Sequence, residues 1–176
     1  IRLSLVGSEM CIRDRLHTGD IGVWEEGEGH FLKIIDRKKE MFKTSGGKYV
    51  VPQQIEKILS ESNYIEQIMV VGEGRKFPAA LVIPSYENCI DWAKTNESSL
   101  INLPREEFLT HPKIYELIGN EINKLNINFG NWEKIKKFHL LSYEFTIEAG
   151  ELTPTLKMKR KIISEKYKKE IDEIYQ

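Results

Sequence analysis

Lys157 is the residue whose type and position are best suited to chemistry. It lies in the segment 151–160, ELTPTLKMKR, where Pro154 interrupts an extended stretch and basic residues then open a helical pattern. An ammonium group on a loop that a rigid helix supports can reach a neighbouring site as a point charge of about +1. The same residues also fit a solvated basic helix start, so both interpretations stay open on residue type alone.

A second group of candidate residues lies far upstream. It comprises HTGD at 17–20, IDR at 35–37 and KTSGGK at 43–48. On residue type alone, Asp20 after a glycine fits a turn-stabilising residue. Arg37 fits a surface ion pair with Glu40. Gly46 and Gly47 allow close approach of a ligand to the backbone, or make a tight turn, but the loop lacks the Walker P-loop spacing.

Alternating helix and strand patterns must position these residues. The first expected elements are a hairpin with strands at 21–24 and 30–35, a helix from Pro52 with Ile55, Ile58 and Leu59 buried, and strands at 65–71 and 79–84. A helix at 86–95, a polar loop at 96–102 and a helix from Pro112 to about Leu125 should follow. The last part should contain a short helix around Trp132 and Ile135, a strand at 137–141, a loop with Gly150 at its tip and one long final helix. Ile162, Ile163, Tyr167, Ile171 and Ile174 give that last helix its core face. Together these elements predict an α+β domain with a sheet of about three strands and helices packed on it.

Composition limits the possible function. The chain has 176 residues, 40% of them hydrophobic, and a net charge of −1, so bulk electrostatics gives no reason to expect a nucleic-acid partner. Cys11 and Cys89 show no metal-ligand spacing and no disulfide framework, so no metal site is expected. Because no apolar run is long enough to span a bilayer, we expect a cytoplasmic protein whose membrane contact, if any, is peripheral.

The order of the motifs carries a family resemblance. TGD, a short hairpin, DRKKE, a Gly-rich loop, VPQQIE and LTPTLKMKR follow one another from about Leu16 to the end of the chain. This order resembles the C-terminal part of the adenylate-forming enzymes, and within them the long-chain fatty acid–CoA ligases. The long insertion from about Tyr86 to Trp132 favours the long-chain branch. Residues 1–15, which contain SLVGSEMCIRDR, do not fit the family and are interpreted as an artefactual leader.

The resemblance implies roles for the candidate residues. Lys157 would be the catalytic lysine beside the α-phosphate of ATP and the fatty carboxylate, with Lys159 as the alternative if the register is shifted by two. Asp20 would hold the ribose hydroxyls, and Arg37 would contact the ribose or phosphate region. His17 is interpreted as a spacer.

The resemblance also implies a domain arrangement. Residues 16–36 would be the hairpin tail of a large N-terminal domain, Asp36 would be the hinge, and 37–176 would be a mobile C-terminal domain. The loop with Gly46 and Gly47 would face the active site during thioester formation, on the CoA side. The adenine pocket, the phosphate loop and the acyl tunnel belong to the large domain, which this sequence lacks, so the fragment alone is predicted to be inactive.

The implied reaction has two half-reactions that use ATP, Mg²⁺ and CoA. A fatty acid first reacts with ATP to give acyl-adenylate and diphosphate, and CoA then displaces AMP to give acyl-CoA. The Mg²⁺ would be bound mainly by the missing domain. Three alternatives remain: an acyl-AMP ligase or carrier-protein loader of the same superfamily, a non-catalytic interaction domain, and an unrelated chemistry on an α+β domain.

Overall fold

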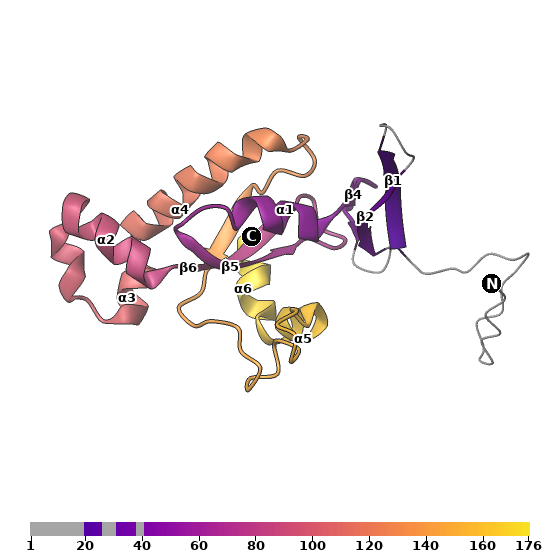
Figure 1. Cartoon of the computed structure of the whole chain (residues 1–176). Coiled ribbons are helices and arrows are strands. Elements are labelled where there is room, and N and C mark those ends of the chain that lie inside the picture. The colour runs from indigo at the N-terminus through magenta and orange to yellow at the C-terminus, as the bar shows by residue number, and fades with distance from the viewer. Residues whose placement is uncertain (1–19, 26–30, 38–40) are drawn as a thin grey trace, which may run out of the picture. The chain divides into compact units, whose positions relative to one another are not determined.

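The structure, a computed structural model, describes residues 20–25, 31–37 and 41–176. The chain divides into two compact units, 1–41 and 42–176, and each is described by itself (Figure 1). The expected artefactual leader, His17 and the possible ion pair of Arg37 with Glu40 lie outside the described residues.

The first unit contains an antiparallel pair of strands. β1 (Asp20–Glu25) pairs with β2 (Phe31–Arg37), which confirms both strands of the predicted hairpin. The register places Asp20 opposite Arg37 and Val23 opposite Lys33, with an irregularity between Ile21 and Gly22.

A three-stranded mixed sheet forms the centre of the second unit. Its strands are β5 (Ile65–Val71), β6 (Ala79–Pro84) and β7 (Lys137–Leu140), in the order β5-β6-β7. β5 and β6 are antiparallel neighbours, whereas β6 and β7 run parallel. Every residue of β6 is buried, as expected for an apolar strand covered on both faces. The prediction of a small α+β domain with about three strands is therefore correct.

Short strands and helices complete this unit. A two-residue pair, β3 (Phe42–Lys43) and β4 (Tyr49–Val50), precedes the first helix. The α-helices are α1 (Pro52–Leu59), α2 (Tyr86–Asn96), α3 (Arg105–Leu109), α4 (Pro112–Leu125), α5 (Arg160–Lys166) and α6 (Lys168–Ile174), and the 3₁₀ helices are η1 (Ser98–Asn102) and η2 (Asn126–Asn128). Pro52 and Pro112 each occupy the first helical turn, where the missing N–H costs no hydrogen bond.

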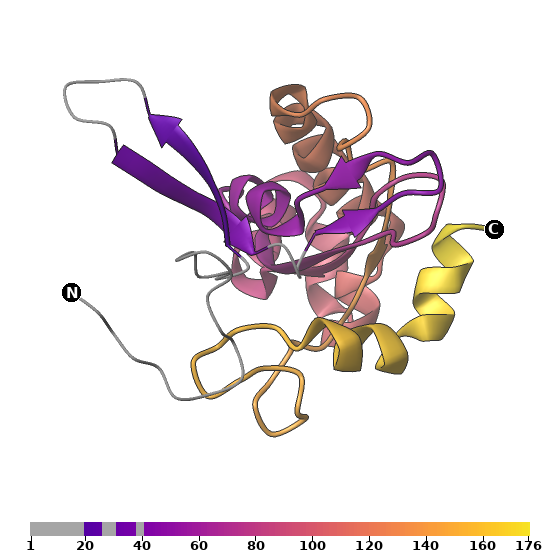
Figure 2. The same ribbon diagram turned by 90° about the vertical axis from the view of Figure 1, so that its right-hand side faces the viewer.

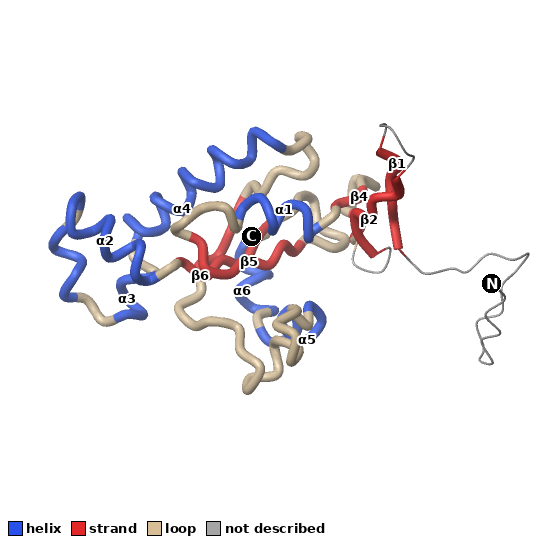
Figure 3. The backbone as a smooth tube through the Cα atoms, in the orientation of Figure 1, coloured by secondary structure: helices blue, strands red, loops and turns tan. Residues whose placement is uncertain are grey.

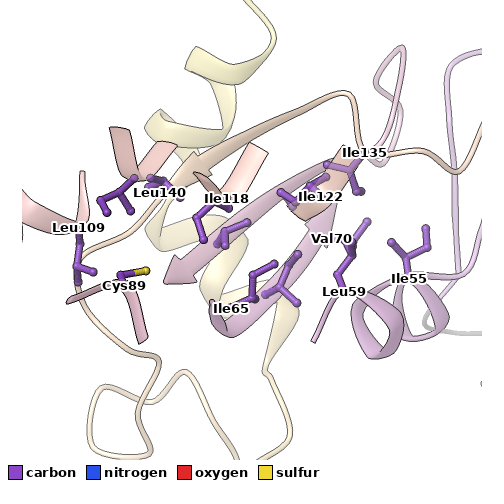
Figure 4. Close-up of a cluster of buried hydrophobic side chains, with 14 of the residues drawn as sticks. Ile55, Leu59, Ile65, Val70, Cys89, Leu109, Ile118, Ile122, Ile135 and Leu140 are labelled. Carbon is purple, nitrogen blue, oxygen red and sulfur yellow. The ribbon is translucent and has the colours of Figure 1, made fainter. Parts of the chain in front are cut away.

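The sheet separates two layers of core. Alternate residues of β5 and β6, such as Val70 and Val82, face a cluster that includes Ile55, Cys89 and Ile118 from α1, α2 and α4 (Figure 4). Their neighbours along the strands face the other side, where a second cluster is formed by Leu141, Phe145, Leu152, Ile163, Ile171 and Ile174. Figures 1 and 2 show α4 on one side of the sheet and α5 with α6 on the other. This period-two division follows from the pleat of the strands.

Five local expectations from the sequence were wrong, and three of them concern the first half of the second unit. The expected polar loop at 96–102 contains η1, because Leu100 is buried and draws the backbone into a turn. The helix α3 was not anticipated, since its five residues are too few to show a periodicity. The stripe of α1 was also wrong in part, because Glu56 is buried in it while Ile58 is only half-buried.

The short helix expected around Trp132 is a single turn. Lys134 N donates to Gly130 O, but the next residue leaves the helical pattern, because the Asn126 side chain pairs with both backbone groups of Ile135 at 2.9 and 3.0 Å. Trp132 itself is 49% exposed, and it lies under the Lys48 ammonium, 5.6 Å from the ring centroid.

The long C-terminal helix is in fact two helices. Tyr167 interrupts it with φ −101° and ψ 28°, so that α5 ends and α6 begins in a new direction. The break allows Ile163 in α5 and Ile171 in α6 both to pack into the second core layer. Ile162, which was expected on the buried face, is 41% exposed.

Candidate functional site

The candidate catalytic lysine lies on a tight β-hairpin between β7 and α5. In this segment, which Figure 3 shows within a stretch of loop, Leu152 and Met158 form an antiparallel bridge. Lys159 N donates to Glu151 O at 2.7 Å, which closes the base of the hairpin. We call residues 151–159 the lysine hairpin.

The tip of the lysine hairpin is a three-residue connection. Leu156 N donates to Thr153 O at 2.8 Å, and Leu156 has a positive φ of 58°. This pattern fits a type I turn followed by a left-handed residue, and Pro154 stands at the turn position that proline favours. A leucine in the left-handed region is unusual, because its Cβ crowds the following carbonyl oxygen. The Leu156 side chain is also 69% exposed, so burial of the side chain within this unit does not explain why a leucine occupies this left-handed position.

The backbone of Lys157 is fixed on both sides by Thr153. Thr153 N donates to Lys157 O at 2.8 Å, and Lys157 N donates to the Thr153 hydroxyl at 3.0 Å. The Lys157 side chain is exposed, and within the described part of the chain its ammonium makes no hydrogen bond or ion pair. Among the described residues the Lys157 ammonium thus has no counter-charge, and the backbone that carries it is held by hydrogen bonds.

Glu151 anchors the first strand of the lysine hairpin. Its side chain is 1% exposed and accepts hydrogen bonds from Lys166 Nζ at 2.9 Å, Tyr167 Oη at 3.0 Å and Thr146 N at 3.1 Å. Burial opposes ionisation of this carboxyl, but the hydrogen bonds from Lys166, Thr146 and Tyr167 outweigh it and lower the pKa of Glu151 below its usual value.

Arg160 anchors the second strand of the lysine hairpin. Its guanidinium pairs with the Glu56 carboxylate of α1 and donates to Val70 O of β5 at 3.3 Å. Arg160 is the first residue of α5, and its side chain is a 24% exposed, partly buried ion-pair partner.

A groove of about 410 Å³ borders the lysine hairpin. α1 and β5 contribute to its lining together with the hairpin, and its apolar lining residues are Ile68, Phe145, Leu152, Leu156 and Met158. Leu156 is thus the residue that lies both at the exposed hairpin tip and at the groove.

The Gly-rich loop connects β3 to β4. Gly47 N donates to Thr44 O at 2.9 Å, and Thr44 N donates to Lys48 O at 2.9 Å. Gly47 has a φ of 81°, so the turn requires a left-handed residue there. Gly46 has open space around it, since an added Cβ would have Thr44 Oγ1 at 4.0 Å as its nearest neighbour.

A second turn supports the Gly-rich loop. Ser45 N donates to Arg75 O at 2.8 Å, and Gly74 N donates to Lys43 O at 2.9 Å. Arg75 in turn forms an ion pair with Asp172 of α6. The C-terminal helix is therefore connected to the loop through the turn that follows β5.

The nucleotide-binding candidates Asp20 and Arg37 are direct cross-strand partners at one end of the first unit. Asp36, in β2, pairs with Ile21 of β1. The structure thus brings the predicted aspartate and arginine into adjacent backbone positions. Lys157, Gly46 and Gly47 belong to the second unit. That Lys157 and Asp20 converge on one nucleotide stays a prediction, as does the hinge at Asp36.

Sequence reasoning missed several residues that hold the site. Thr153 fixes Lys157 through its hydroxyl, and Glu56, Glu151 and Arg160 anchor the hairpin. One signal was available for Glu56, because it lies next to Ile55 and three residues before Leu59, at the border of the apolar stripe. Glu151 and Arg160 gave no comparable local signal.

The described residues contain neither a metal-ligand cluster nor a membrane-spanning helix. In residues 20–25, 31–37 and 41–176, no group of three or more His, Cys, Asp or Glu side chains gathers as a metal site. None of the helices over the same ranges combines the length and apolar character that crossing a bilayer requires.

A known protein family matches most of the chain. The family described as "AMP-binding enzyme C-terminal domain" matches residues 40–176. The long-chain-fatty-acid–CoA ligase FadD15 of Mycobacterium tuberculosis is 37% identical over 158 residues, which are 90% of this chain and 26% of that protein. Human long-chain-fatty-acid–CoA ligase 6 is 38% identical over 163 residues, 91% of this chain and 23% of its own length. The chain therefore spans about a quarter of the relatives it matches.

A solved structure shares the fold. The adenylation domain of a carboxylate reductase from Mycobacterium chelonae superposes with a TM-score of 0.73 at 23% sequence identity, covering 95% of this chain and 24% of that one. This similarity concerns the fold, which agrees with the α+β architecture described above.

Proposed function

The chain belongs to the AMP-binding enzyme C-terminal domain family, and on that premise we propose that it is the C-terminal part of an ATP-dependent long-chain fatty acid–CoA ligase. The whole reaction would convert a fatty acid, ATP and CoA into acyl-CoA, AMP and diphosphate through an acyl-adenylate. The observation that carries the proposal is the lysine hairpin, which holds the backbone of Lys157 at both ends while leaving its ammonium exposed.

Lys157 would act in the first half-reaction. A fatty carboxylate and the α-phosphate of ATP are both anionic, so their approach is opposed by electrostatic repulsion. A pre-placed ammonium offsets that repulsion, and one such contact contributes on the order of 3 kcal/mol to transition-state stabilisation. The ordered hairpin supports this role, because a charge already in place requires little reorganisation during the reaction.

Asp20 and Arg37 would bind the nucleotide together. Their cross-strand pairing supports this assignment, since a carboxylate for the ribose hydroxyls and a guanidinium for the ribose or phosphate region would share one end of the hairpin. The Gly-rich loop, with Gly46 unhindered, would face CoA in the second half-reaction. Asp36 would serve as the hinge between the large domain and residues 37–176.

Mg²⁺ is assigned to the missing domain. In the family reaction Mg²⁺ would be bound mainly by the large domain, and the roles proposed for Lys157, Asp20 and Arg37 concern the nucleotide and the fatty carboxylate. The fragment itself would complete a site whose acyl tunnel and phosphate loop lie in the large domain, and it would close over that site as a mobile lid.

The test joins residues 16–176 to the large domain of a long-chain relative. The fusion should form acyl-CoA from fatty acid, ATP and CoA. Lys157→Ala should lower acyl-adenylate formation on the order of 100-fold or more, while thioester formation from supplied acyl-adenylate is kept. Lys159→Ala is the matched control, because it removes the same charge two residues away on the same strand.

Each result has a defined meaning. Equal loss of both half-reactions in Lys157→Ala would contradict the role assigned to Lys157, and a selective loss in Lys159→Ala would move the role to that lysine. Acyl transfer to a carrier-protein thiol but not to CoA would identify the carrier-protein loader instead.

A further inference from the structure

We propose that Glu56 and Arg160 form a clamp that positions Lys157 for acyl-adenylate formation, an inference that rests on the function proposed above. Both are positioning residues, which act through the lysine hairpin and touch no substrate themselves. We call this pair, together with the backbone of Val70, the edge clamp.

The edge clamp lies on the outer strand of the sheet. β5 is an edge strand, so backbone groups along its free side need partners other than a neighbouring strand. At Val70 these partners are side chains: its N–H donates to Glu56 Oε1 at 2.6 Å, and its carbonyl oxygen accepts from Arg160 Nη1 at 3.3 Å. The second Glu56 oxygen pairs with Arg160 Nη2, which closes a ring of three partners from α1, β5 and α5.

Burial makes the pairing sensitive to either partner. The Glu56 side chain is 8% exposed and the Arg160 side chain 24% exposed. Removal of either side chain deletes an ion pair that is largely shielded from water, where solvent replaces it less readily than at an open surface. The guanidinium fork is also directional, so the pair fixes where residue 160 lies along β5 more precisely than two apolar side chains would.

The position of Arg160 is transmitted to Lys157 over a short, hydrogen-bonded path. Arg160 follows Lys157 by three residues, and the intervening Lys159 and Met158 are both held by the opposite strand of the hairpin. That opposite strand begins at Glu151, whose side chain is attached to α5 through Lys166.

The two strands of the hairpin are therefore held by different elements. Glu151 attaches the first strand to α5, and the edge clamp attaches the second strand and the start of α5 to α1 and β5. Without the clamp, the hairpin and α5 would still be joined to each other but would lose this ionic attachment to the edge of the sheet. The direction in which Lys157 projects from the domain would then be less well defined.

Two variants isolate the edge clamp. Glu56→Gln keeps an oxygen for the Val70 N–H but removes the charge that faces Arg160. Arg160→Lys keeps the charge but loses the fork that binds Glu56 and Val70 at once. The matched control is Arg105→Lys, in an ion pair with Glu144 at 2.9 Å whose side chains are 50% and 48% exposed.

The first measurement is amide hydrogen exchange on the 176-residue chain. In both clamp variants, exchange at the Leu156 and Lys159 amides should rise roughly tenfold, because the hairpin opens more often, while the amides of α4 keep their rates. The control variant should change none of them. Unchanged exchange in the lysine hairpin of both clamp variants would overturn the proposal.

The second measurement uses the fusion with a large domain and separates the clamp from its premise. Both clamp variants should lower the kcat of acyl-adenylate formation roughly tenfold while keeping thioester formation from supplied acyl-adenylate. Lys157→Ala is measured in parallel. Normal adenylation in Lys157→Ala would refute the role proposed for Lys157, whereas loss there combined with normal adenylation in both clamp variants would refute the clamp alone.

Discussion

The two adjacent glycines of the Gly-rich loop should differ in how their substitution by alanine changes the free energy of unfolding. Gly47 has a φ of 81°, a conformation that costs an L-residue about 1–2 kcal/mol. An alanine there also lowers the conformational entropy of the unfolded chain, which stabilises the folded state by about 0.4–1 kcal/mol. A steric clash adds no further destabilisation, because the nearest neighbour of the new Cβ would be Lys43 Cε at 3.7 Å. Gly47→Ala should therefore lower the free energy of unfolding by about 1 kcal/mol.

Gly46→Ala provides the comparison. The added Cβ would meet only Thr44 Oγ1 at 4.0 Å, and the residue has no positive φ. The restriction of the unfolded chain then remains as the main effect, so stability should be unchanged or rise by up to about 1 kcal/mol. Urea unfolding of the 176-residue chain, followed by circular dichroism, measures both variants against the unmodified protein.

The functional readout tests whether Gly46 is needed for a ligand. In the fusion with a large domain, Gly46→Ala should slow thioester formation from supplied acyl-adenylate although the fold is intact, because the methyl group would occupy the surface that CoA approaches. Equal destabilisation by both alanines would refute the backbone reasoning. Normal thioester formation in Gly46→Ala would refute the assignment of this loop to CoA.

Three further predictions concern stability and reactivity. Leu156→Gly removes the strain of the left-handed backbone at φ 58° but raises the conformational entropy of the unfolded chain, so the free energy of unfolding should be unchanged or rise by up to about 1 kcal/mol. Leu156→Ala keeps the strain and should show no gain in stability in urea unfolding. The folded pKa of Glu151 lies below the ordinary 4.5, so its contribution to stability is complete above that value and is lost as the pH falls through the folded pKa; Glu151→Gln should flatten this part of an acid titration of stability, and an unchanged slope would contradict it. Burial raises the pKa of Cys89 to about 12, so in a Cys11→Ser chain iodoacetamide at pH 8 should modify Cys89 only when urea unfolds the protein; rapid modification of the folded chain would show that the thiol is accessible.

Elements with a strong local signal were predictable from the sequence. The strands 65–71 and 79–84 match β5 and β6 residue for residue, because an apolar run bounded by turn residues is distinctive. The helix from Pro112 was also found, since proline and regularly spaced isoleucines mark both its start and its buried face.

The contacts that hold the lysine hairpin were not predictable in this way. Glu56 and Arg160 are 104 residues apart, and a single sequence contains nothing that links one charged residue to a particular distant partner. The break at Tyr167 has the same origin, because the spacing of Ile163 and Ile171 also fits a continuous helix and only packing against the sheet distinguishes the two. Local periodicity identified the helical stretch that follows Lys157, but the hairpin that carries Lys157 and the tertiary contacts that hold it were not visible in the sequence.

The parallel pairing of β6 with β7 has a consequence for protein synthesis. When residues 79–84 have emerged from a ribosome, β5 can pair with one side of β6, but the other side must wait for residues 137–140. During that interval the sequence AALVIP offers a free, wholly apolar edge to any other chain nearby. Termination of translation inside the stretch 85–136 should therefore yield an aggregating nascent product, whereas termination after Leu140 leaves the central strand with both of its neighbours.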